Sequence, residues 1–478
     1  MSEPLPLGLT FDDVLLVPRR SGVSTRRQVS TRARLCKDIE LAVPLVSASM
    51  DSVTESGMAI AIAREGGIGI IHRFLTVADH VGEVRRVKRA ESVVIDTPYT
   101  VGIEATVRVA AGFIDERGPA SVLVLDRDRR LLGIVTARDL LFEDDLDRPI
   151  AAVMTPRERL ITAPVGTPVE EAKRILHRHR IEKLPLLDAE GRLVGLITSR
   201  DIQNRRRYPQ ATKDARGRLR VGAAIGVRGD YLERAQALVE AEVDVLVIDI
   251  AHGHSDLAFH TVEAVRERCG DVALIVGNVA TPDGTRELIA CGADGIKVGV
   301  GPGSTCTTRV VTGAGVPQLT AILACAEAAA ASGVPVIADG GIRTSGDLVK
   351  ALAAGANTAM LGNLLAGTEE SPGTSVTRHG RQYKVYRGMA SLWTSAERRD
   401  LPQDDELLSE IVPEGIEALV PYRGRVSAVL GQLIGGLRSG MSYCGATTID
   451  ELHRNARFMR VTDAGVREGK PHDVDALP

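Results

Sequence analysis

The stretch VDVLVIDIAHG (residues 243–253) decides the fold, because an apolar strand runs directly into a polar, glycine-containing loop. The same pattern returns in VALIVGNVAT (272–281), GADGIKVGVGPGS (292–304), VPVIADGGIRTSGD (334–347) and ANTAMLGNLLAG (356–367), with alanine-rich helical stretches between them. Nearly continuous apolar strands at this spacing are typical of a parallel sheet covered by helices.

Two similar units come earlier in the chain and end at VPLVSASMD (43–51) and GGIGIIHR (66–73). About eight strand–helix units in roughly 360 residues predict an α/β protein built on a (β/α)8 TIM barrel. A doubly wound sheet is the competing prediction, but no GxGxxG sequence opens a strand–helix unit here.

An internal repeat interrupts the barrel pattern. ASVLVLDRDRRLLGIVTARDLL (120–141) reappears as KLPLLDAEGRLVGLITSRDIQ (183–203), each copy reading strand, polar turn, strand and a T-x-R-D step into a helix. Two copies are too few for a solenoid, so we expect one pseudo-symmetric module over residues 93–207. We expect this inserted module in the βα loop after the second barrel strand, with residues 1–92 and 208–478 forming the barrel.

Composition narrows the function classes. The 478 residues carry 59 basic and 62 acidic side chains, and a net charge of −3 argues against a general nucleic-acid binder. The apolar runs are strand-sized and the N-terminus lacks the features of a signal peptide, so we expect no membrane partner and a cytoplasmic protein. The six cysteines form no CxxC pair, which argues against a disulfide framework and a zinc site.

The strongest chemical motif is GVGPGSTCTTR (299–309), in which Cys306 follows three glycines, a proline and a serine. Backbone N–H groups and hydroxyls in such a loop can hold an oxyanion or a phosphate. The electropositive loop and Arg309 could activate the thiol as a nucleophile. The alternative is a buried structural cysteine in a tight turn.

Polar groups at other strand ends suit a nucleotide. Gly340–Gly341 and Gly362–Asn363 lie where late loops of TIM barrels commonly bind phosphate, unless they are simple turns. Asp339 is placed to accept from ribose hydroxyls. Asp249, in VIDIAHGHS (247–255), suits a ribose or dinucleotide contact better than metal, because H-G-H in a loop is poor ligand geometry. Asn278 extends from the next strand.

Together these motifs resemble the inosine-monophosphate dehydrogenase and guanosine-monophosphate reductase family over essentially the whole chain. Further stretches that carry the resemblance are LTFDDVLLVP, PLVSASMDSVTE, EGGIGIIHR, YRGM, VPEGIE, GGLRSGMSYCGA and AGVREGKPHD. The inserted module resembles a pair of cystathionine-β-synthase-type (CBS) repeats, a Bateman module, which is a common insertion in the dehydrogenases.

The resemblance implies that Cys306 attacks C2 of the purine, that a hydride passes to NAD, and that Thr308 helps to activate the hydrolytic water. It also implies a homotetramer, with an octamer as a further assembly through the inserted module. The implied binding residues form three groups: for the purine nucleotide Met50, Ser304, Asp339, Gly341, Gly362, Asn363, Tyr386, Gly388, Met389 and Glu414; for NAD Asp249, Asn278 and Lys297; for K+ Gly301, Gly303 and Cys306, with Glu468, Gly469 and Lys470 of the partner subunit.

Two departures from the family pattern affect the predicted reaction. The phosphate loop has Gly362–Asn363 where the family usually has Gly-Ser. The family's dehydrogenases carry an Arg-Tyr pair on a mobile flap, whereas WTSAERRDLPQDDELLSEIVPEG (393–415) offers Arg398 and Arg399 as the water-activating base with no tyrosine after either. The alternative for both arginines is a solvated loop.

The sequence leaves alternatives open for the direction of the reaction. The reductase branch carries a glutamate after the cysteine loop, but AILACA (321–326) has Ala324 at that position. We therefore expect an NAD-dependent IMP dehydrogenase that oxidises IMP to XMP for guanine nucleotide synthesis. The alternatives are an NADPH-dependent reductase of GMP or a modified 2-aminopurine nucleotide, and a catalytically weakened regulatory paralogue.

The repeats of the inserted module each place an aspartate at the start of a helix, after a threonine at a strand end. These pairs are Thr136 with Asp139 and Thr198 with Asp201. The carboxylate can accept from ribose hydroxyls while the helix start faces phosphates, which predicts binding of adenine or guanine nucleotides. Plain helix capping is the alternative.

Overall fold

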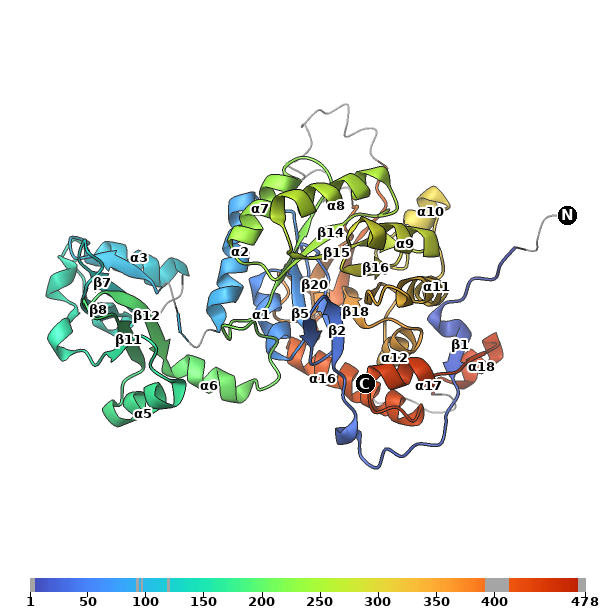
Figure 1. Ribbon diagram of the computed structural model, residues 1–478, viewed down its shortest axis with the longest axis horizontal. Helices are drawn as coiled ribbons and strands as arrows, with labels where there is room; N and C mark the ends of the chain where they lie inside the picture. Colours follow the sequence, from blue (N-terminus) through green and yellow to red (C-terminus); the bar gives the residue numbers. More distant parts are fainter. Residues whose placement is uncertain (1–4, 92–93, 96–97, 118–120, 392–411, 472–478) are drawn as a thin grey trace. The chain divides into compact units, whose positions relative to one another are not determined.

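The computed structural model describes residues 5–91, 94–95, 98–117, 121–391 and 412–471 (Figure 1). The chain divides into two compact units. The first consists of Met1–Ala90, Gln210–Asp214 and Leu219–Pro478, and the second of Glu91–Pro209 and Ala215–Arg218.

The first unit is a closed barrel of eight parallel strands, which confirms the predicted TIM barrel. Strand β18 pairs with β4 to close the ring, and most strand residues are buried because the sheet has side chains inside and helices outside. The strands are β4 (Leu45–Ser47), β5 (Ile68–Ile71), β13 (Gly222–Ile225), β14 (Val245–Asp249), β15 (Ala273–Val279), β16 (Gly295–Val298), β17 (Val336–Asp339) and β18 (Thr358–Leu361).

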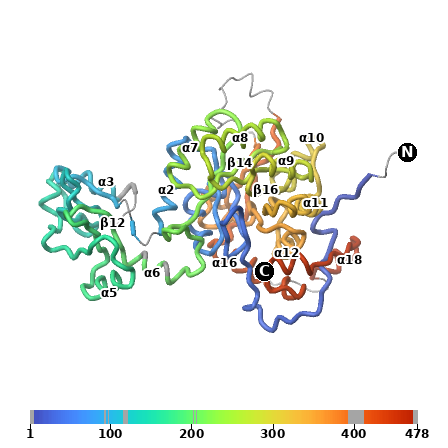
Figure 2. The backbone as a smooth tube through the Cα atoms, viewed as in Figure 1, coloured from blue at the N-terminus to red at the C-terminus, as the bar shows by residue number. Residues whose placement is uncertain are grey.

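Helices alternate with these strands and follow one another around the barrel in the backbone trace (Figure 2). Local signals set their ends: Thr281 caps α9, Pro282 is its first residue, and Gly292 ends it in a left-handed conformation. The barrel helices are α1 (Ser56–Arg64), α2 (Val77–Ala90), α7 (Tyr231–Glu240), α8 (Asp256–Cys269), α9 (Pro282–Cys291), α11 (Gln318–Ala330), α12 (Ser345–Ala353) and α16 (Val426–Tyr443).

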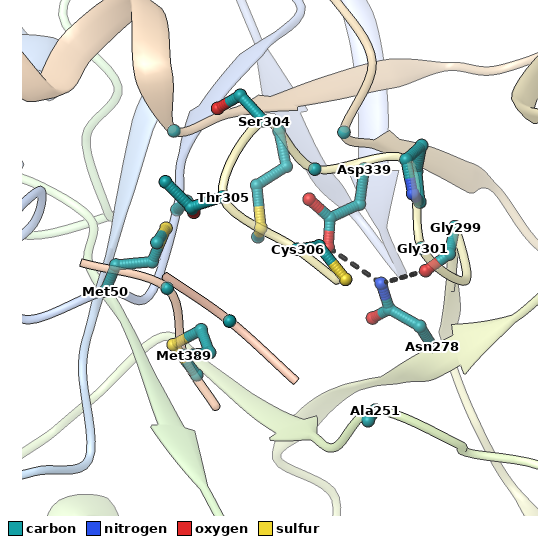
Figure 3. Close-up of a pocket in the computed structure, with 18 of the residues that line it drawn as sticks. Met50, Ala251, Asn278, Gly299, Gly301, Ser304, Thr305, Cys306, Asp339 and Met389 are labelled. Atoms are coloured by element: carbon teal, nitrogen blue, oxygen red, sulfur yellow. Dashed lines mark hydrogen bonds between the residues drawn. The ribbon is translucent and has the colours of Figure 1, made fainter. Parts of the chain in front are cut away.

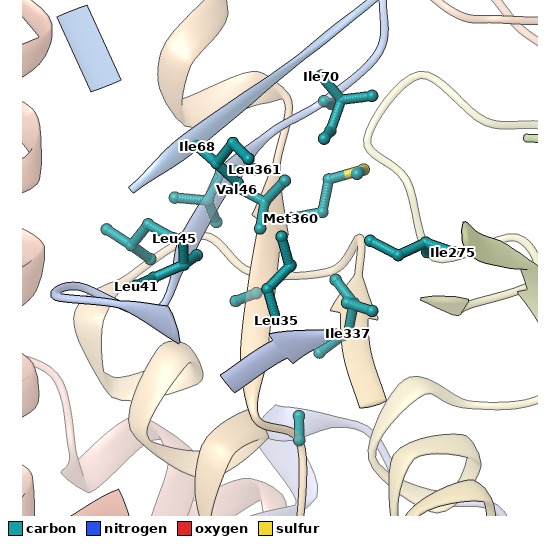
Figure 4. Close-up of a cluster of buried hydrophobic side chains, with 14 of the residues drawn as sticks. Leu35, Leu41, Leu45, Val46, Ile68, Ile70, Ile275, Ile337, Met360 and Leu361 are labelled. Carbon is teal, nitrogen blue, oxygen red and sulfur yellow. The ribbon is translucent and has the colours of Figure 1, made fainter. Parts of the chain in front are cut away.

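A hairpin covers the amino-terminal mouth of the barrel. Its strands are β2 (Ala33–Cys36) and β3 (Ile39–Leu41), and a Cβ added at Gly295, the first residue of β16, would lie 3.3 Å from Cys36 Cβ. Leu35 is fully buried in one apolar cluster with barrel residues such as Ile275 (Figure 4). The barrel interior is therefore closed at this end, and a ligand site is left to the other end.

Short elements outside the barrel tie the two chain ends together. Strand β1 (Val14–Leu16) pairs antiparallel with β22 (Phe458–Arg460), just before α18 (Asp463–Glu468). A further sheet of β19 (Ser375–Arg378), β20 (Arg381–Arg387) and β21 (Glu417–Pro421) follows α13 (Asn363–Ala366), and α17 (Ile449–Asn455) follows α16.

The second unit contains two halves of the same construction. In each half the first strand runs parallel to the second, the second pairs antiparallel with the third, and the register shifts within the second strand. One apolar cluster joins Leu123 and Ile134 of the first half to Leu187 and Leu196 of the second. The halves are β6 (Thr100–Gly102), α3 (Val107–Arg117), β7 (Ser121–Leu125), β8 (Leu131–Thr136) and α4 (Ala137–Leu140), then β10 (Ala163–Pro164), α5 (Val169–His179), β11 (Lys183–Leu187), β12 (Leu193–Thr198) and α6 (Ser199–Arg207).

The predicted insertion point is wrong in one respect. The chain leaves the barrel after α2 has followed β5, so the second unit interrupts the connection from α2 to β13 and not a βα loop. Helix α2 escaped notice because its buried face mixes Val84 and Val87 with His80, Glu83 and Lys88, which leaves only a narrow apolar stripe.

An ion pair holds the exit and the re-entry of the chain together. Lys88, near the end of α2, lies 3.2 Å from an Asp214 carboxylate oxygen and 2.6 Å from one of Asp244. The backbone N–H of Thr212 also donates to the carbonyl of Ala63, at the end of α1. The barrel unit is thus closed across the point where the chain leaves it.

Candidate active site

A cavity of about 460 Å³ opens among the loops that follow the carboxyl ends of the barrel strands (Figure 3). The structure brings most of the predicted site residues to its lining. They are Met50, Asp249, Asn278, Lys297, Gly301, Gly303, Ser304, Cys306, Thr308, Asp339, Gly341, Gly362, Asn363, Tyr386, Gly388, Met389 and Glu414. Glu468, Gly469 and Lys470 are not in this lining, and Arg398 and Arg399 lie outside the described residues.

Cys306 and Thr308 lie side by side in the loop between β16 and α11. The Cys306 thiol is 3.1 Å from Thr308 Oγ1, and Thr308 begins the short helix α10 (Thr308–Thr312). Cys306 lines the cavity, whereas Cys325 on α11 is fully buried and is not in the lining. Cys306 is therefore the thiol that a bound substrate can reach at this site.

Two close backbone approaches shape this end of the cavity. Gly299 (φ +151°) leaves no room for a side chain, because a Cβ would lie 2.1 Å from the Asp339 carbonyl oxygen. Gly340 (φ +91°) also lies too close to the cysteine loop for a side chain, with Pro302 Cγ 2.9 Å from where a Cβ would stand. The cysteine loop and the loop after β17 can therefore touch only because both positions are glycine.

The charged centre of the cavity is Lys297 of β16, whose side chain is almost fully buried. Its ammonium lies 2.8 Å from an oxygen of Asp249 and 2.7 Å from one of Asp339, and it also donates to Asn278 Oδ1. Asn278 Nδ2 in turn donates to Asp339 (3.0 Å) and to the Gly299 carbonyl (2.6 Å) (Figure 3). Side chains from four strand ends thus form one hydrogen-bonded network.

This network keeps its charges ionised in spite of burial. Burial alone would lower the pKa of Lys297, but the carboxylates of Asp249 and Asp339 outweigh it and raise that pKa above its ordinary value. Burial would likewise raise the pKa of Asp249, yet Lys297 and the Ser49 hydroxyl bring it below its usual range. Asp249 is therefore a carboxylate at neutral pH.

A second polar region lies where the loop after β18 meets β20. A Cβ on Gly362 would lie 2.8 Å from the Tyr386 hydroxyl, which contacts Met50 Sδ at 3.6 Å. Burial raises the pKa of Tyr386, although hydrogen bonds with Ser304 and Thr305 oppose the shift. The phenol therefore stays neutral and can donate to an anion.

Backbone pairing joins the cysteine loop to the segments on either side of residues 392–411. Thr307 N donates to the Glu414 carbonyl (2.8 Å), and Ile416 N donates to the Thr305 carbonyl (2.9 Å). Gly415 forms an isolated bridge with Cys306 and another with Ser391. Both ends of the sequence predicted as the flap are consequently fastened beside Cys306.

Several cavity residues were missed by the sequence reading. Ser49 donates to Asp249, and Arg73 follows β5 into the cavity lining. Arg343, also in the lining, donates to Asp12 at 2.6 Å. All three belong to motifs quoted from the sequence, VSASMD, GGIGIIHR and ADGGIR, so a strand-end polar residue was the available signal for each.

The prediction that Arg309 activates the thiol finds no direct contact. The guanidinium instead donates to the carbonyls of Val300 and Val316. Its hydrogen bonds go to the loop backbone, and its interaction with Cys306 is electrostatic, so activation of the thiol by Arg309 stays a prediction.

In the second unit the threonine and aspartate of the first half form a helix cap. Thr136 Oγ1 accepts from Asp139 N, while an Asp139 oxygen accepts from Thr136 N at 2.8 Å and from its hydroxyl at 2.7 Å. Thr198 ends β12 at the equivalent point, and the side chain of Asp201 lies outside the described part of the chain. In the first half, Thr136 and Asp139 therefore cap the helix, as the alternative prediction had it.

Known proteins with similar sequence and structure match nearly the full length of the chain. A profile described as the IMP dehydrogenase / GMP reductase domain matches residues 8–472. The chain is 52% identical over 472 residues to an inosine-5'-monophosphate dehydrogenase of Nitrosopumilus maritimus, covering 98% of both chains. It is 53% identical over 470 residues to that of Aquifex aeolicus, covering 98% of this chain and 96% of the relative.

A solved structure is also similar over nearly the full length of the chain. A GMP reductase variant from Trypanosoma brucei in complex with guanosine 5'-monophosphate superimposes with a TM-score of 0.92. It is 44% identical, and the match covers 98% of this chain and 99% of that one. The family resemblance predicted from the motifs is confirmed: the chain belongs to the IMP dehydrogenase / GMP reductase family.

Proposed function

We propose that this protein is an IMP dehydrogenase, which oxidises IMP to XMP with NAD in guanine nucleotide synthesis. The observation that carries the assignment is identity above 50% along the full length of relatives named as that enzyme. These identities confirm the predicted dehydrogenase and not the reductase. Ala324 on α11 agrees with this assignment, because the reductase branch has a glutamate at the matching position.

The chemistry assigned to the chain centres on Cys306. Its sulfur forms a bond to C2 of the purine, and NAD, when bound, supplies the hydride acceptor. Water then attacks the same carbon and releases the thiol. Thr308 Oγ1, 3.1 Å from the sulfur, is placed to take part in moving the proton of that water.

The nucleotide contacts follow from the two polar regions of the cavity. Asp339 is assigned to the ribose hydroxyls, and the phosphate to Ser304, Gly341, Gly362, Asn363 and Tyr386. The base lies among Met50, Gly388, Met389 and Glu414. Asp249 and Asn278 are assigned to NAD, while Lys297 is assigned to hold Asp249 and Asp339 in place, because its ammonium already has three partners.

Arg398 and Arg399 remain the proposed bases for the hydrolytic water. Their segment leaves from Ser391 and returns at Val412, and the described residues at both ends pair beside Cys306. The pairing of Gly415 with both Cys306 and Ser391 supports this proposal from the described residues alone.

A potassium ion is proposed at the carbonyls of Gly301, Gly303 and Cys306, completed by Glu468, Gly469 and Lys470 of the partner subunit. Hard cations prefer oxygen ligands. The Gly303 carbonyl accepts from Cys306 N at 3.1 Å and keeps a second lone pair for a cation. This site would order the cysteine loop.

The second unit is proposed as a CBS-type regulatory module that binds adenine or guanine nucleotides, with Thr136, Asp139, Thr198 and Asp201 as contacts. Its two equivalent halves around one apolar cluster support a pair of related sites. We also propose a cytoplasmic homotetramer that can form an octamer through this module. None of the described helices has the length and apolar composition needed to cross a bilayer.

One assay tests the reaction direction. Purified protein with IMP and NAD should form NADH, followed by absorbance, and XMP, followed by chromatography. Consumption of NADPH with GMP and no reaction of IMP would instead identify a reductase, the activity named for the similar Trypanosoma brucei structure. Nucleotide binding without turnover in either assay would identify the weakened paralogue.

A further inference from the structure

The loop that carries Cys306 and Thr308 is long and has little regular structure. It runs from the end of β16 to the start of α11, residues 299–317, and contains only the short helix α10. A nucleophile needs a fixed position, since a displacement of about 1 Å can cost about 10²-fold in rate. Something within the loop has to hold its two ends together.

The side chain of Arg309 fills the inside of this loop. A Cβ added at Gly301 would lie 2.5 Å from Arg309 Cγ, and one at Gly315 would lie 2.7 Å from the same atom. Both glycines have positive φ, +82° and +150°. The loop therefore folds over the stem of Arg309 from both sides.

The head of Arg309 connects the two ends of the loop. Its Nε donates to the Val300 carbonyl at 3.1 Å, and its Nη2 donates to the Val316 carbonyl at 2.5 Å. A guanidinium has donors in a rigid fork and can hold two carbonyls at once, whereas an ammonium is a point charge on a flexible stem. Partial burial lowers the pKa of Arg309, and the electrostatic interaction with Cys306 opposes that shift. The two hydrogen bonds to carbonyls offset part of the cost of placing the cation there.

We propose that Arg309 is a positioning residue, which sets the places of Cys306 and Thr308 by joining the carbonyls of Val300 and Val316. Its contribution is the fork geometry and not its positive charge near the thiol. The inference rests on the proposed role of Cys306 as the nucleophile.

The test compares Arg309→Lys with Arg309→Met in the full-length protein. Both variants keep a long stem, only Lys keeps the charge, and neither has the planar fork of Nε and Nη2 that reaches Val300 and Val316 from fixed positions. We expect kcat to fall about 10- to 100-fold in both, with a much smaller change in KM for IMP. Alkylation of Cys306 by iodoacetamide, followed by mass spectrometry, should keep the same pH midpoint in the parent and both variants.

Two results would overturn the proposal. If Arg309→Lys restores kcat to within about twofold of the parent, charge and not geometry is what matters. If the midpoint of alkylation rises in Arg309→Met and stays at the parental value in Arg309→Lys, Arg309 acts on the thiol directly. The Lys variant alone decides the question should the Met variant fail to fold.

Arg266→Met is the matched control for general stability. Arg266 also holds backbone carbonyls, with Nη1 2.6 Å from Val272 O and Nη2 2.7 Å from Gly292 O, but these precede β15 and β16 at the other end of the barrel. Its kcat should stay parental even if its melting temperature falls, and an equal loss of kcat would overturn the inference. Cys306→Ala separates the two proposals, because turnover in that variant would remove the nucleophile itself.

Discussion

Replacing Lys297 by methionine tests the charged network at the centre of the cavity. Methionine keeps most of the side-chain length and apolar volume of lysine, so packing in β16 should change little. What disappears is the ammonium between Asp249 and Asp339, 2.8 and 2.7 Å from their oxygens. Two carboxylates then face each other without the cation that holds them.

The size of the effect follows from burial. The side chains of Lys297 and Asp249 are 2% and 10% exposed, and removing one partner of a buried pair costs about 3–5 kcal/mol. Asp339 is 21% exposed and can recover some hydration. We therefore expect the free energy of unfolding to fall by about 3 kcal/mol at neutral pH, the lower end of that range.

The dependence of this loss on pH has a definite sign. In the parent, Lys297 helps to bring the pKa of Asp249 below its unfolded value, so the stability from this carboxylate is present above that value and is lost as pH falls through the folded pKa. In Lys297→Met, burial should raise the pKa of Asp249 above the unfolded value. The variant then gains stability as pH falls, and the gap to the parent narrows between about pH 7 and pH 4.

Urea unfolding followed by circular dichroism at several pH values measures this gap, and steady-state kinetics supply the functional readout. KM should rise for both IMP and NAD, because the network holds one proposed contact for each. Lys88→Met is the matched control, since Lys88 is also buried between two aspartates but lies outside the cavity lining. It should lose stability and keep both KM values.

Parental stability of Lys297→Met at neutral pH would show that the ammonium does not stabilise the two carboxylates. A loss that does not shrink on acidification would contradict the expected rise in the pKa of Asp249. A rise in KM of the same size in Lys88→Met would show that the kinetic effect comes from general destabilisation.

Four further predictions concern separate parts of the molecule. Thr308→Val should keep the pre-steady-state burst of NADH and slow hydrolysis by about 10²-fold or more, whereas loss of the burst would contradict its role. Asn363→Asp should raise KM for IMP about tenfold or more, because a carboxylate would face the phosphate, and unchanged KM would move the phosphate elsewhere. Asp139→Ala should weaken the binding of ATP, ADP, GTP or GDP in calorimetry, and it should lower the stability of the module by about 1 kcal/mol because the helix cap is lost. If none of these nucleotides gives heat with the parent, the proposed nucleotide-binding role of the module is wrong. Replacing residues 91–209 by a short flexible linker should leave an active barrel, because Lys88 and Asp214 already hold the chain ends together, and loss of basal activity would contradict this.

The barrel could be predicted from sequence because its strands are local signals. Most of them are largely apolar and end in, or are followed by, glycine or a polar residue. Both the strand pattern and the end of the strand can therefore be recognised without knowledge of tertiary contacts. Helix α2 lacked such a signal, because its buried positions include His80 and Lys88, whose burial depends on Arg234, Asp214 and Asp244. The insertion point was misplaced for that reason.

The residues that line the site could be predicted better than the hydrogen bonds and ion pairs between them. Cys306, Asp249 and Asp339 follow strands, and all parallel strands end at the same edge, so their meeting in one cavity follows from topology. That Lys297 joins the two carboxylates depends on the stagger of neighbouring strands, in which Gly277 pairs with both Asp249 and Lys297. Such a register is a property of the closed barrel.

Lys297 and Arg309 show why residue type alone could not assign roles within one strand–loop unit. Both are cations near Cys306 in sequence, and the sequence analysis predicts contact with NAD for Lys297 and activation of the thiol for Arg309. In the structure each is enclosed by acceptors of its own chain: carboxylates and an amide around Lys297, backbone carbonyls around Arg309. A cation that the fold removes from solvent, almost wholly at Lys297 and partly at Arg309, must first satisfy its own donors. The acceptors that the fold supplies therefore decide whether it meets a ligand or holds the residues that do.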